Sequence, residues 1–542
     1  MLWLFLGCKT PGADSAEPGG HEPATYPLAD QLYTTLQATW KALDPPEATK
    51  TAISDDELLV TEIDRYAEMG LGVELGPGTT WTVLDDLAPG YEPDDDRASL
   101  AYIWQAADPQ IIDEESPIRF EPFEQLFRPH GHLAAQTFEA SVRTARALSD
   151  ASGRPFDFAL VAGDMTDGSQ RNELDWWLTA LNGGTIDPDS GDDDDPVAGP
   201  GNDFNDPFLS EGLDTPWYAV LGNHDGLYNG GFGVIDEALK AGAVAGEVYD
   251  SEIFVNGFRD GADPNAGVVT EGETPPDADR EPLTVAELLQ ALHEAEGEPA
   301  GHGLSADDVA AERGYFSVHP MADKPLRLVA LQTVDGTKGP AEGSEGWISA
   351  EQGVWLEGEL AAADAASEVV IVLSHHRAKE LSGDSEVDED ALSELLAGSD
   401  NVVLHVTGHG HANTRTLYED ASAEQGYWQL MCASTVDFPM QTRIVELVDE
   451  RDGHLSIYVT NVGHNSPEGS LGHEGRALAG GSLLFPNFYY QSDLQGYLDG
   501  QAEQQNVLLR VPIPQDVQDE LARHSWSERV ESVETLEALE GP

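Results

Sequence analysis

The middle of the chain alternates between two hydrophobic patterns. Short apolar runs that predict buried strands are followed by stretches in which apolar residues recur every three to four positions, which predict helices. The expected strands are 100–107, 156–161, 217–221, 326–331, 368–373 and 402–406, and the expected helices are 131–151, 173–181 and 350–363. This order of elements is typical of an α/β protein.

Other segments depart from this alternation. Strands are also expected at 427–430, 443–448, 455–459 and 507–511, which we assign to a second sheet. Near the N-terminus, the spacing of Leu32, Leu36, Trp40 and Leu43 predicts a helix. Residues 187–206 hold eight aspartates and predict a solvated loop, with a calcium-binding loop as the alternative. Residues 229–313 form an insertion long enough to be a cap.

These features divide the chain into four parts. We expect a signal remnant and flexible tether over residues 1–27 and an N-terminal extension over 28–97. The main domain covers 98–462 and includes the cap-like insertion, and a C-terminal extension follows over 463–542.

The charge of the chain restricts its partners. Lys and Arg total 27 and Asp and Glu total 100, which leaves a formal net charge of −73. Such a surface repels nucleic acid and anionic membranes, so neither is expected as a direct partner. The composition indicates a salt-adapted or extracytoplasmic protein, with simple lineage bias as the alternative.

Cysteines and the first residues bear on location. Cys8 and Cys432 are the only cysteines, which excludes a disulfide framework and a cysteine-rich zinc site. The apolar start ends at Gly7-Cys8 and resembles a bacterial lipoprotein signal, although no basic residue precedes it and Phe5 stands where leucine is usual. The resemblance implies lipidation of Cys8 and a place in the bacterial cell envelope or outside the cell. A frayed apolar terminus is the alternative.

Polar motifs follow the expected strands. They are Ala-Asp-Pro-Gln (Asp108, Gln110), Gly-Asp-Met-Thr-Asp (Asp164, Asp167), Gly-Asn-His-Asp (Asn223, His224, Asp225), Ser-His-His (His375, His376) and Gly-His-Gly-His (His409, His411). Ligands bind beyond the carboxyl ends of strands in α/β sheets. Carboxylates, amides and imidazoles suit divalent ions such as Mn, Fe, Zn or Mg. The motifs therefore predict a metal centre.

The order of these motifs resembles the calcineurin-like metallophosphoesterase superfamily over roughly residues 98–462. The stretches Thr166–Glu173 and Ser434–Pro439 further resemble a secreted bacterial branch that has Asp-Pro-Gln as its first motif. The resemblance implies a four-layer α/β/β/α sandwich and two divalent metal ions of unknown identity. It also implies hydrolysis of a phosphorylated small molecule through in-line attack by a hydroxide that bridges the two ions.

The resemblance also implies a role for each residue. Asp108 and His411 would hold the first ion, Asn223, His375 and His409 the second, and Asp164 would bridge both. Gln110 stands where many members have a metal-binding histidine, and its carbonyl oxygen would bind more weakly. His224 would donate to the phosphate or the leaving group, with Asp225 orienting it and Asp167 in a supporting role.

Three more residues are candidates for the surroundings of the site. His376 and Arg377 follow His375 directly, and Arg377 would reach a phosphate oxygen or be an ordinary surface arginine. His302 in Gly-His-Gly would face the substrate or have a structural role in the cap.

The motifs leave the kind of ester open. A phosphodiesterase or nucleotidase is the alternative to a phosphomonoesterase, because both act on the same phosphoryl group. A non-catalytic scaffold that keeps the fold is the alternative from another class, although the near-complete ligand set favours an enzyme. The oligomeric state stays open.

Overall fold

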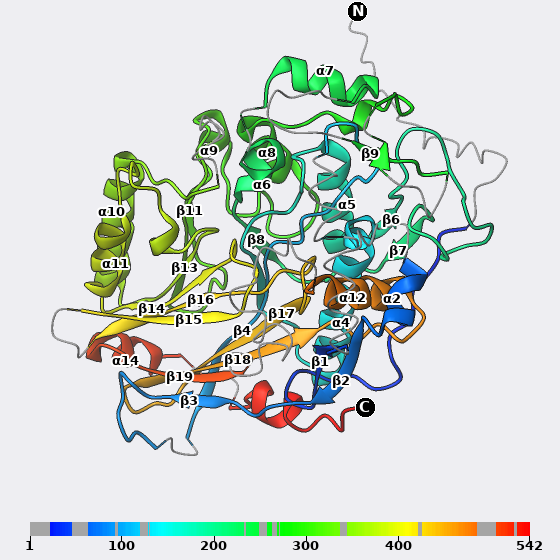
Figure 1. Ribbon diagram of the computed structural model, residues 1–542. Helices are drawn as coiled ribbons and strands as arrows, with labels where there is room; N and C mark the ends of the chain where they lie inside the picture. Colours follow the sequence, from blue (N-terminus) through cyan, green and yellow to red (C-terminus); the bar gives the residue numbers. More distant parts are fainter. Residues whose placement is uncertain are drawn as a thin grey trace, which may run out of the picture.

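Two large β-sheets form the centre of the molecule (Figure 1). The computed structural model describes residues 22–45, 63–92, 96–119, 128, 130–231, 233, 235–248, 257–262, 268–269, 271–335, 344–420, 425–484, 506–524 and 528–542. Cys8 lies outside these residues. No helix in the described part of the chain combines the length and the apolarity that crossing a membrane requires.

The first sheet has seven strands in the order β3-β19-β18-β17-β4-β5-β8. Its parallel part consists of β4 (Ala98–Ala106), β5 (Phe158–Val161) and β8 (Trp217–Ala219). The antiparallel strands β17 (Gln441–Asp449), β18 (His454–Gly463) and β19 (Val507–Pro512) extend it, and β3 (Thr82–Leu84) ends it beside β19. Because β3 precedes residue 98 and β19 follows residue 462, the sheet includes one strand from each of the two expected extensions.

The second sheet has six strands in the order β11-β12-β13-β14-β16-β15. The strands β12 (Leu326–Ala330), β13 (Val369–Leu373), β14 (Val402–Thr407) and β16 (Gly426–Met431) run parallel between the antiparallel edge strands β11 (Phe316–Val318) and β15 (Thr414–Glu419). The prediction that 427–430 shares a sheet with 443–448, 455–459 and 507–511 is therefore wrong. Pairing depends on contacts between distant segments, which the pattern along one strand does not encode.

Helices cover the outer face of each sheet (Figure 1). The helices α10 (Ala350–Ala366) and α11 (Glu389–Ala397) lie on the second sheet, and α4 (Ala134–Ser152), α5 (Arg171–Asn182) and α12 (Leu471–Ser482) lie on the first. On β13, Ile371 belongs to the core that the two sheets share, whereas Val370 and Val372 pack against α10 and α11. Both faces of β13 are apolar because both are buried. The predicted four-layer α/β/β/α sandwich is confirmed.

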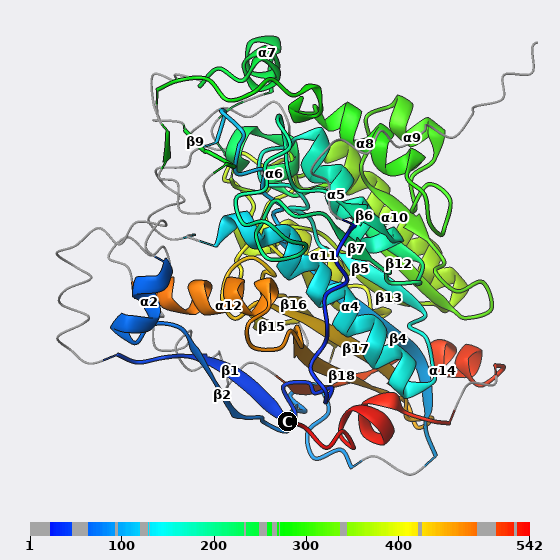
Figure 2. The same ribbon diagram turned by 90° about the vertical axis from the view of Figure 1, so that its right-hand side faces the viewer.

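The insertion 229–313 lies at one end of the molecule (Figure 2). Its described elements are α7 (Glu237–Ala245), β9 (Phe258–Arg259), β10 (Val268–Val269), a 3-10 turn (Ala278–Arg280), α8 (Val285–Glu294) and α9 (Ala306–Ala310). Two buried arginines of the insertion reach the segment that follows Gln110. Arg280 Nε lies 3.3 Å from Asp113 Oδ2, and Arg259 Nε lies 3.5 Å from Glu114 Oε2.

The N-terminal segment contradicts its helical pattern. Residues Ala38–Ala42 form strand β1, which pairs with β2 (Val73–Pro77), and Trp40 Nε1 donates to Tyr33 Oη over 3.0 Å. Ala42 packs against Phe438 and other residues from the C-terminal half. These tertiary contacts outweigh a local spacing that favours a helix.

The aspartate-rich loop forms no helix or strand, as predicted, but it is not uniformly solvated. Asp203 and Asp206 are buried, and their carboxylates accept hydrogen bonds from backbone N–H groups of the loop itself. The last residues are likewise packed, because the backbone N–H groups of Glu531 and Ser532 donate to buried Glu446.

Candidate metal centre

The polar motifs meet where strands of the two sheets end. Asp108 follows β4, Asp164 follows β5, and Asn223 opens the short helix α6 (Asn223–Gly226) after β8. His375 follows β13, and His409 follows β14. Since these strands are parallel within each sheet, their carboxyl ends lie at one edge and bring the motifs together.

The backbone at these motifs is unusual. Asp108, Gln110, Asp164, His409 and His411 all have positive φ angles, between 39° and 73°. Such conformations cost about 1–3 kcal/mol each for residues with a side chain and cluster at functional sites. They turn each side chain off the end of its strand and into the centre.

Two glycines give the motifs the space to approach. A Cβ atom on Gly222 would lie 2.0 Å from Asp164 Oδ1, so only glycine fits there. Gly163 has a φ of 87°, and a Cβ on it would lie 2.7 Å from His375 Nδ1. Gly222 therefore provides room, whereas Gly163 provides both room and a left-handed turn.

The first group of ligand-type side chains consists of Asp108, Gln110, Asp164 and His411. His411 Nε2 lies 3.4 Å from Asp108 Oδ1 and 3.4 Å from the Gln110 amide nitrogen, which lies 3.1 Å from Asp164 Oδ2. The ligand atoms of Asp108, Asp164 and His411 lie within 4.8 Å of one another, close enough for one metal ion.

The Gln110 amide fits a metal ligand when it is turned over. Its Oε1 atom is buried without a hydrogen-bond partner, while Nε2 faces Asp164 and His411. The two ends of an amide exchange by a 180° rotation, and their assignment follows from the hydrogen-bond network. The rotated amide would place a carbonyl oxygen beside the other donors.

The second group consists of Asn223, His375 and His409, together with Asp164. Asn223 Oδ1 lies 3.0 Å from His375 Nε2 and 3.0 Å from His409 Nδ1. Nδ1 of His375 lies 2.6 Å from the Ala162 carbonyl oxygen, and the Asn223 amide nitrogen donates to Gly230 O. With Nδ1 as the donor, His375 directs the lone pair of Nε2 at an amide oxygen. Such facing acceptors fit a cation between them.

Asp164 is shared by the two groups. Its Oδ2 atom lies 3.1 Å from Gln110 Nε2 in the first group and 3.4 Å from His375 Nε2 in the second. Its Oδ1 atom accepts the backbone N–H of His224 over 2.8 Å. One oxygen therefore faces both groups, while the other is used by the backbone.

The carboxylates of the centre attract positive charge. Burial lowers the pKa of His375, but Asp164 outweighs it and raises the pKa to about 10. At His411, burial is outweighed by Asp108 and Asp437, and the pKa rises to about 9. The carboxylates thus favour a cation at both groups, which divalent metal ions would supply.

His224 is oriented by Asp167 and not by Asp225 as expected. His224 Nδ1 lies 2.9 Å from the Asp167 carbonyl oxygen and 3.3 Å from Asp167 Oδ1. The Asp225 carboxylate instead accepts hydrogen bonds from Thr166 and from the Gly222 backbone. Asp225 therefore fixes the turns that carry Asp164 and Asn223. Burial lowers the pKa of His224, but Asp164 and Asp167 outweigh it and raise the pKa to about 9.

Two residues that the sequence did not single out lie behind His411. Asp437 Oδ2 lies 2.5 Å from His411 Nδ1, and Arg128 contacts both oxygens of Asp437 at 3.0 Å. Asp437 lies in the Ser434–Pro439 stretch that supported the family resemblance, so the sequence could have indicated it as a site residue. Arg128 lies outside every motif, and nothing in the sequence indicated it.

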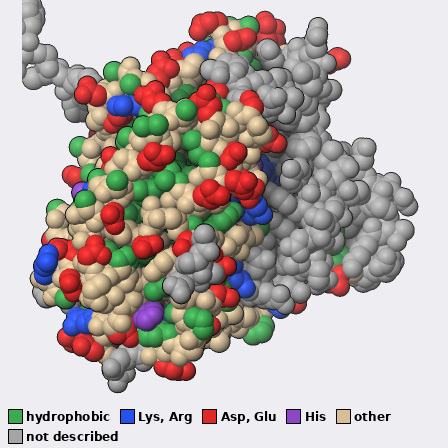
Figure 3. Space-filling view, turned by 90° about the vertical axis from the view of Figure 1, so that its left-hand side faces the viewer, with side chains coloured by type: hydrophobic (Ala, Val, Ile, Leu, Met, Phe, Trp, Pro, Cys, Tyr) green, Lys and Arg blue, Asp and Glu red, His purple; other side chains and the backbone are tan. Residues whose placement is uncertain are grey.

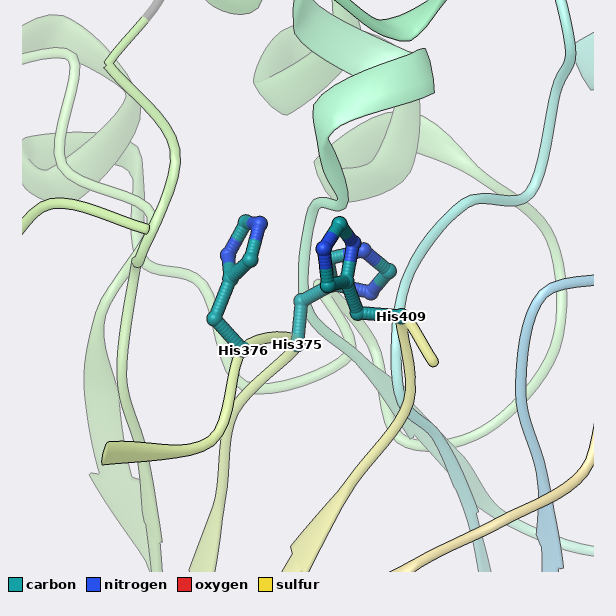
Figure 4. Close-up of side chains that lie close together, drawn as sticks. All are labelled: His375, His376 and His409. Carbon is teal, nitrogen blue, oxygen red and sulfur yellow. The ribbon is translucent and has the colours of Figure 1, made fainter. Parts of the chain in front are cut away.

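The remaining candidates have different surroundings. His376 lies beside His375 and His409, with Nδ1 2.9 Å from Thr333 Oγ1 (Figure 4). Arg377 is held by an ion pair with Glu380. His302 stacks on the Trp217 ring at 3.4 Å and is buried, which supports the structural alternative over a substrate-facing role.

Comparisons with known proteins find similar solved structures only. No protein-family model matches the sequence, and no curated protein matches it. A dimetal phosphatase from Danio rerio is 12% identical, covers 68% of this chain and 99% of its own, and has a TM-score of 0.39. A purple acid phosphatase from yellow lupin seeds is 11% identical, with 73% and 57% covered and a TM-score of 0.33. PhoD is 11% identical, with 82% and 89% covered and a TM-score of 0.33. Likenesses at these TM-scores carry no weight for function, so a functional conclusion has to rest on the residues of the metal centre.

Proposed function

We propose that this protein is a metal-dependent hydrolase of phosphate esters. The observation that carries the proposal is the position of Asp164 Oδ2, which faces Gln110 at 3.1 Å and His375 at 3.4 Å. A carboxylate oxygen shared by two ligand groups suits two divalent ions held close together. Paired ions clamp a phosphoryl group by neutralising its oxygens and supply a nucleophile from water at neutral pH.

Side chains of the two groups would bind the two metal ions. Asp108, Gln110 and His411 would bind one ion and Asn223, His375 and His409 the other, with Asp164 between them. The donor sets differ, since the first group offers mostly oxygen and the second offers two imidazoles. An oxygen-rich set favours harder ions such as Mg or Mn.

His224 is suited to donate a proton to the leaving oxygen. The Asp167 carbonyl occupies its Nδ1 atom, and the Asp167 carboxylate, 3.3 Å from the same nitrogen, favours the protonated imidazole. Nε2 is then the nitrogen that can transfer a proton. The His224 side chain is 19% exposed, compared with 0% for His375, so it is accessible to a substrate. General acid catalysis of this kind contributes about 10²–10⁴ in rate.

The test is metal removal followed by an ester panel. Protein stripped by a chelator should hydrolyse neither p-nitrophenyl phosphate nor bis(p-nitrophenyl) phosphate, and divalent ions should restore at least one activity. The ester restored distinguishes a phosphomonoesterase from a phosphodiesterase. Metal binding without turnover of any ester would instead support the non-catalytic scaffold.

A matched pair of variants tests the shared carboxylate. Asp164→Asn should lose turnover and at least one equivalent of metal by elemental analysis, because the shared position needs an anionic oxygen. Asp86→Asn, an exposed aspartate away from the centre, should keep both. Two retained equivalents in Asp164→Asn would contradict the bridging role.

We also propose that the protein is anchored to a bacterial membrane through Cys8. The support is the apolar start that ends at Gly7-Cys8 and the polar stretch after it. Cys8 would carry the several acyl chains that stable anchoring needs. Cys8→Ser removes this attachment point, so the active protein should move from the membrane to the soluble fraction. A wild-type protein found soluble in the cytoplasm with an unmodified N-terminus would overturn this assignment.

A further inference from the structure

A line of charged side chains joins the two halves of the centre. It runs from His411 in the first ligand group through Asp437, Arg128 and Asp167 to His224. Of these five residues, His224, Asp167 and His411 already have a part in the metal and proton chemistry proposed above, whereas Arg128 and Asp437 do not. The three residues between the two histidines alternate in charge, and all three are buried.

The first half of the line fixes His411. Asp437 Oδ2 lies 2.5 Å from His411 Nδ1, so the imidazole presents Nε2 to Asp108 and Gln110. A carboxylate behind a metal-binding histidine sets the ring orientation and raises its basicity.

Arg128 is the centre of the line. Its Nε atom donates to Asp437 Oδ1 and its Nη2 atom to Asp437 Oδ2, each over 3.0 Å, in the parallel two-bond arrangement that a guanidinium makes with a carboxylate. Its remaining nitrogen, Nη1, lies 3.7 Å from Asp167 Oδ1. One planar group therefore contacts two carboxylates that serve different residues.

The second half of the line reaches His224. The Asp167 oxygen that faces Arg128 also lies 3.3 Å from His224 Nδ1. Asp167 Oδ2 lies 3.9 Å from Arg119 Nη1, so each oxygen of this carboxylate faces a different arginine. The loss of Arg128 would loosen Asp167 without freeing it.

A buried arginine beside a metal centre is unexpected in a chain with so few basic residues. Lys and Arg total only 27 in 542 residues, and a cation beside a metal centre opposes metal binding. The carboxylates of Asp437 and Asp167 nevertheless lie beside Arg128 on the way to each functional histidine. Arg128 Nη2 also lies 3.4 Å from His411 Nδ1, but both nitrogens are donors when Nδ1 donates to Asp437, so the attraction runs through the carboxylate. From this geometry, and resting on the proposed function, we infer that Arg128 is a positioning residue that sets His411 for metal binding and His224 for proton donation together.

The metal arm of the test needs no turnover. Arg128→Gln and Asp437→Asn should each weaken binding of Mn²⁺ or Zn²⁺ by about 10–100-fold in competition with a chelating dye, the usual effect of losing such a partner. Because Arg128 acts on His411 through Asp437, the double variant should bind no more weakly than Asp437→Asn alone. Losses that multiply would overturn the inference.

The proton arm uses turnover at saturating metal. Arg128→Gln should still turn over more slowly than wild type on whichever p-nitrophenyl ester the wild type hydrolyses, with the loss in kcat. The same substitution in a His224→Ala background should have no further effect. A loss that persists without His224 would show that Arg128 acts elsewhere. Arg128→Lys should recover kcat in part but not metal affinity, since lysine keeps the charge and lacks the planar fork.

A matched control separates positioning from stability. Arg327 also joins two carboxylates, Glu368 at 2.7 Å and Glu359 at 2.8 Å, on strand β12. Arg327→Gln should lower Tm and leave metal affinity unchanged. Equal weakening in both variants would reduce Arg128 to a stabilising ion pair. If the protein hydrolyses no ester, the proposed function fails while the metal arm still decides the role of Arg128 at His411.

Discussion

At the scale of single residues, the centre depends on close contacts that a methyl group would break. Gly230 has a φ of 70°, and its carbonyl oxygen accepts the hydrogen bond of the Asn223 amide. A Cβ atom on Gly230 would lie 2.3 Å from His224 Nε2, the nitrogen assigned to proton donation. Gly230 therefore has two roles: its carbonyl orients the Asn223 amide, and its lack of a side chain leaves room for the His224 ring.

Gly230→Ala should lower turnover by at least about tenfold, because the new methyl group displaces the His224 ring from a position worth about 10²–10⁴ in rate. The backbone carbonyl that accepts the Asn223 amide is kept in this variant, so metal content measured by elemental analysis should stay near wild type. Gly358→Ala on α10 is the control, since a Cβ there meets nothing within 4 Å. Unchanged turnover in Gly230→Ala would show that Nε2 of His224 is not the donor.

Within the second sheet, a single element carries both packing and a polar network. Strand β14 is buried along its length, yet it includes His405. Nδ1 of His405 accepts from the Gln429 amide at 2.9 Å, and Nε2 lies 2.7 Å from Ser374 Oγ. Ser374 Oγ donates to the His376 carbonyl, so this network supports the turn that carries His375.

His405 should make the protein less stable in acid. Burial lowers its pKa to about 3, whereas an unfolded histidine has a pKa of about 6.5. Between about pH 6.5 and pH 3, His405 is protonated in the unfolded state but neutral in the folded state. The free energy of unfolding therefore decreases as the pH falls from about 6.5 towards 3. The slope is at most about 1.4 kcal/mol per pH unit. The free energy of unfolding measured against pH should fall more steeply in wild type than in His405→Gln, and equal slopes would contradict this.

Helix α10 shows how a helix is fixed to the sheet. Leu356 is buried against the apolar outer face of the second sheet, whereas Val354 on the same helix is 69% exposed. Leu356→Ala should lower the free energy of unfolding by about 2–5 kcal/mol through lost contacts and a cavity. Val354→Ala should change it by no more than about 0.5 kcal/mol. Denaturant titration of both variants is the measurement, and similar losses would refute the assigned layer.

For the whole molecule, the dominant property is negative charge. The net charge is −73, and Asp and Glu side chains are spread over the face drawn in Figure 3, where Lys and Arg are few. Repulsion of this kind destabilises the compact state. It acts over about 10 Å at 0.1 M salt and about 3 Å at 1 M.

Thermal stability should therefore rise with salt. Tm measured by calorimetry should increase as NaCl goes from about 0.1 M to about 1 M, with most of the gain at the lower concentrations, where the screening length changes most. An uncharged osmolyte at matched osmotic strength is the control, because it does not screen charge. A Tm that is constant or falls with NaCl would mean that the acidic surface does not limit stability.

The local pattern of the sequence determined the strands, most helices and the metal motifs. Periodicity reports which residues of one segment are buried, and parallel strands need both faces apolar. A strand end is also a local feature, so the sequence alone identifies the ligand candidates that follow strands: Asp108, Asp164, Asn223, His375 and His409.

Contacts between distant segments were decided only by the tertiary structure. Trp40 lies on a strand because β1 pairs with β2, and β16 joins the second sheet because it pairs with β14. Asp167 rather than Asp225 meets His224, and Arg128 reaches Asp437 from 309 positions away in the chain. Such pairs depend on how elements pack against one another, and no spacing along the chain records that packing.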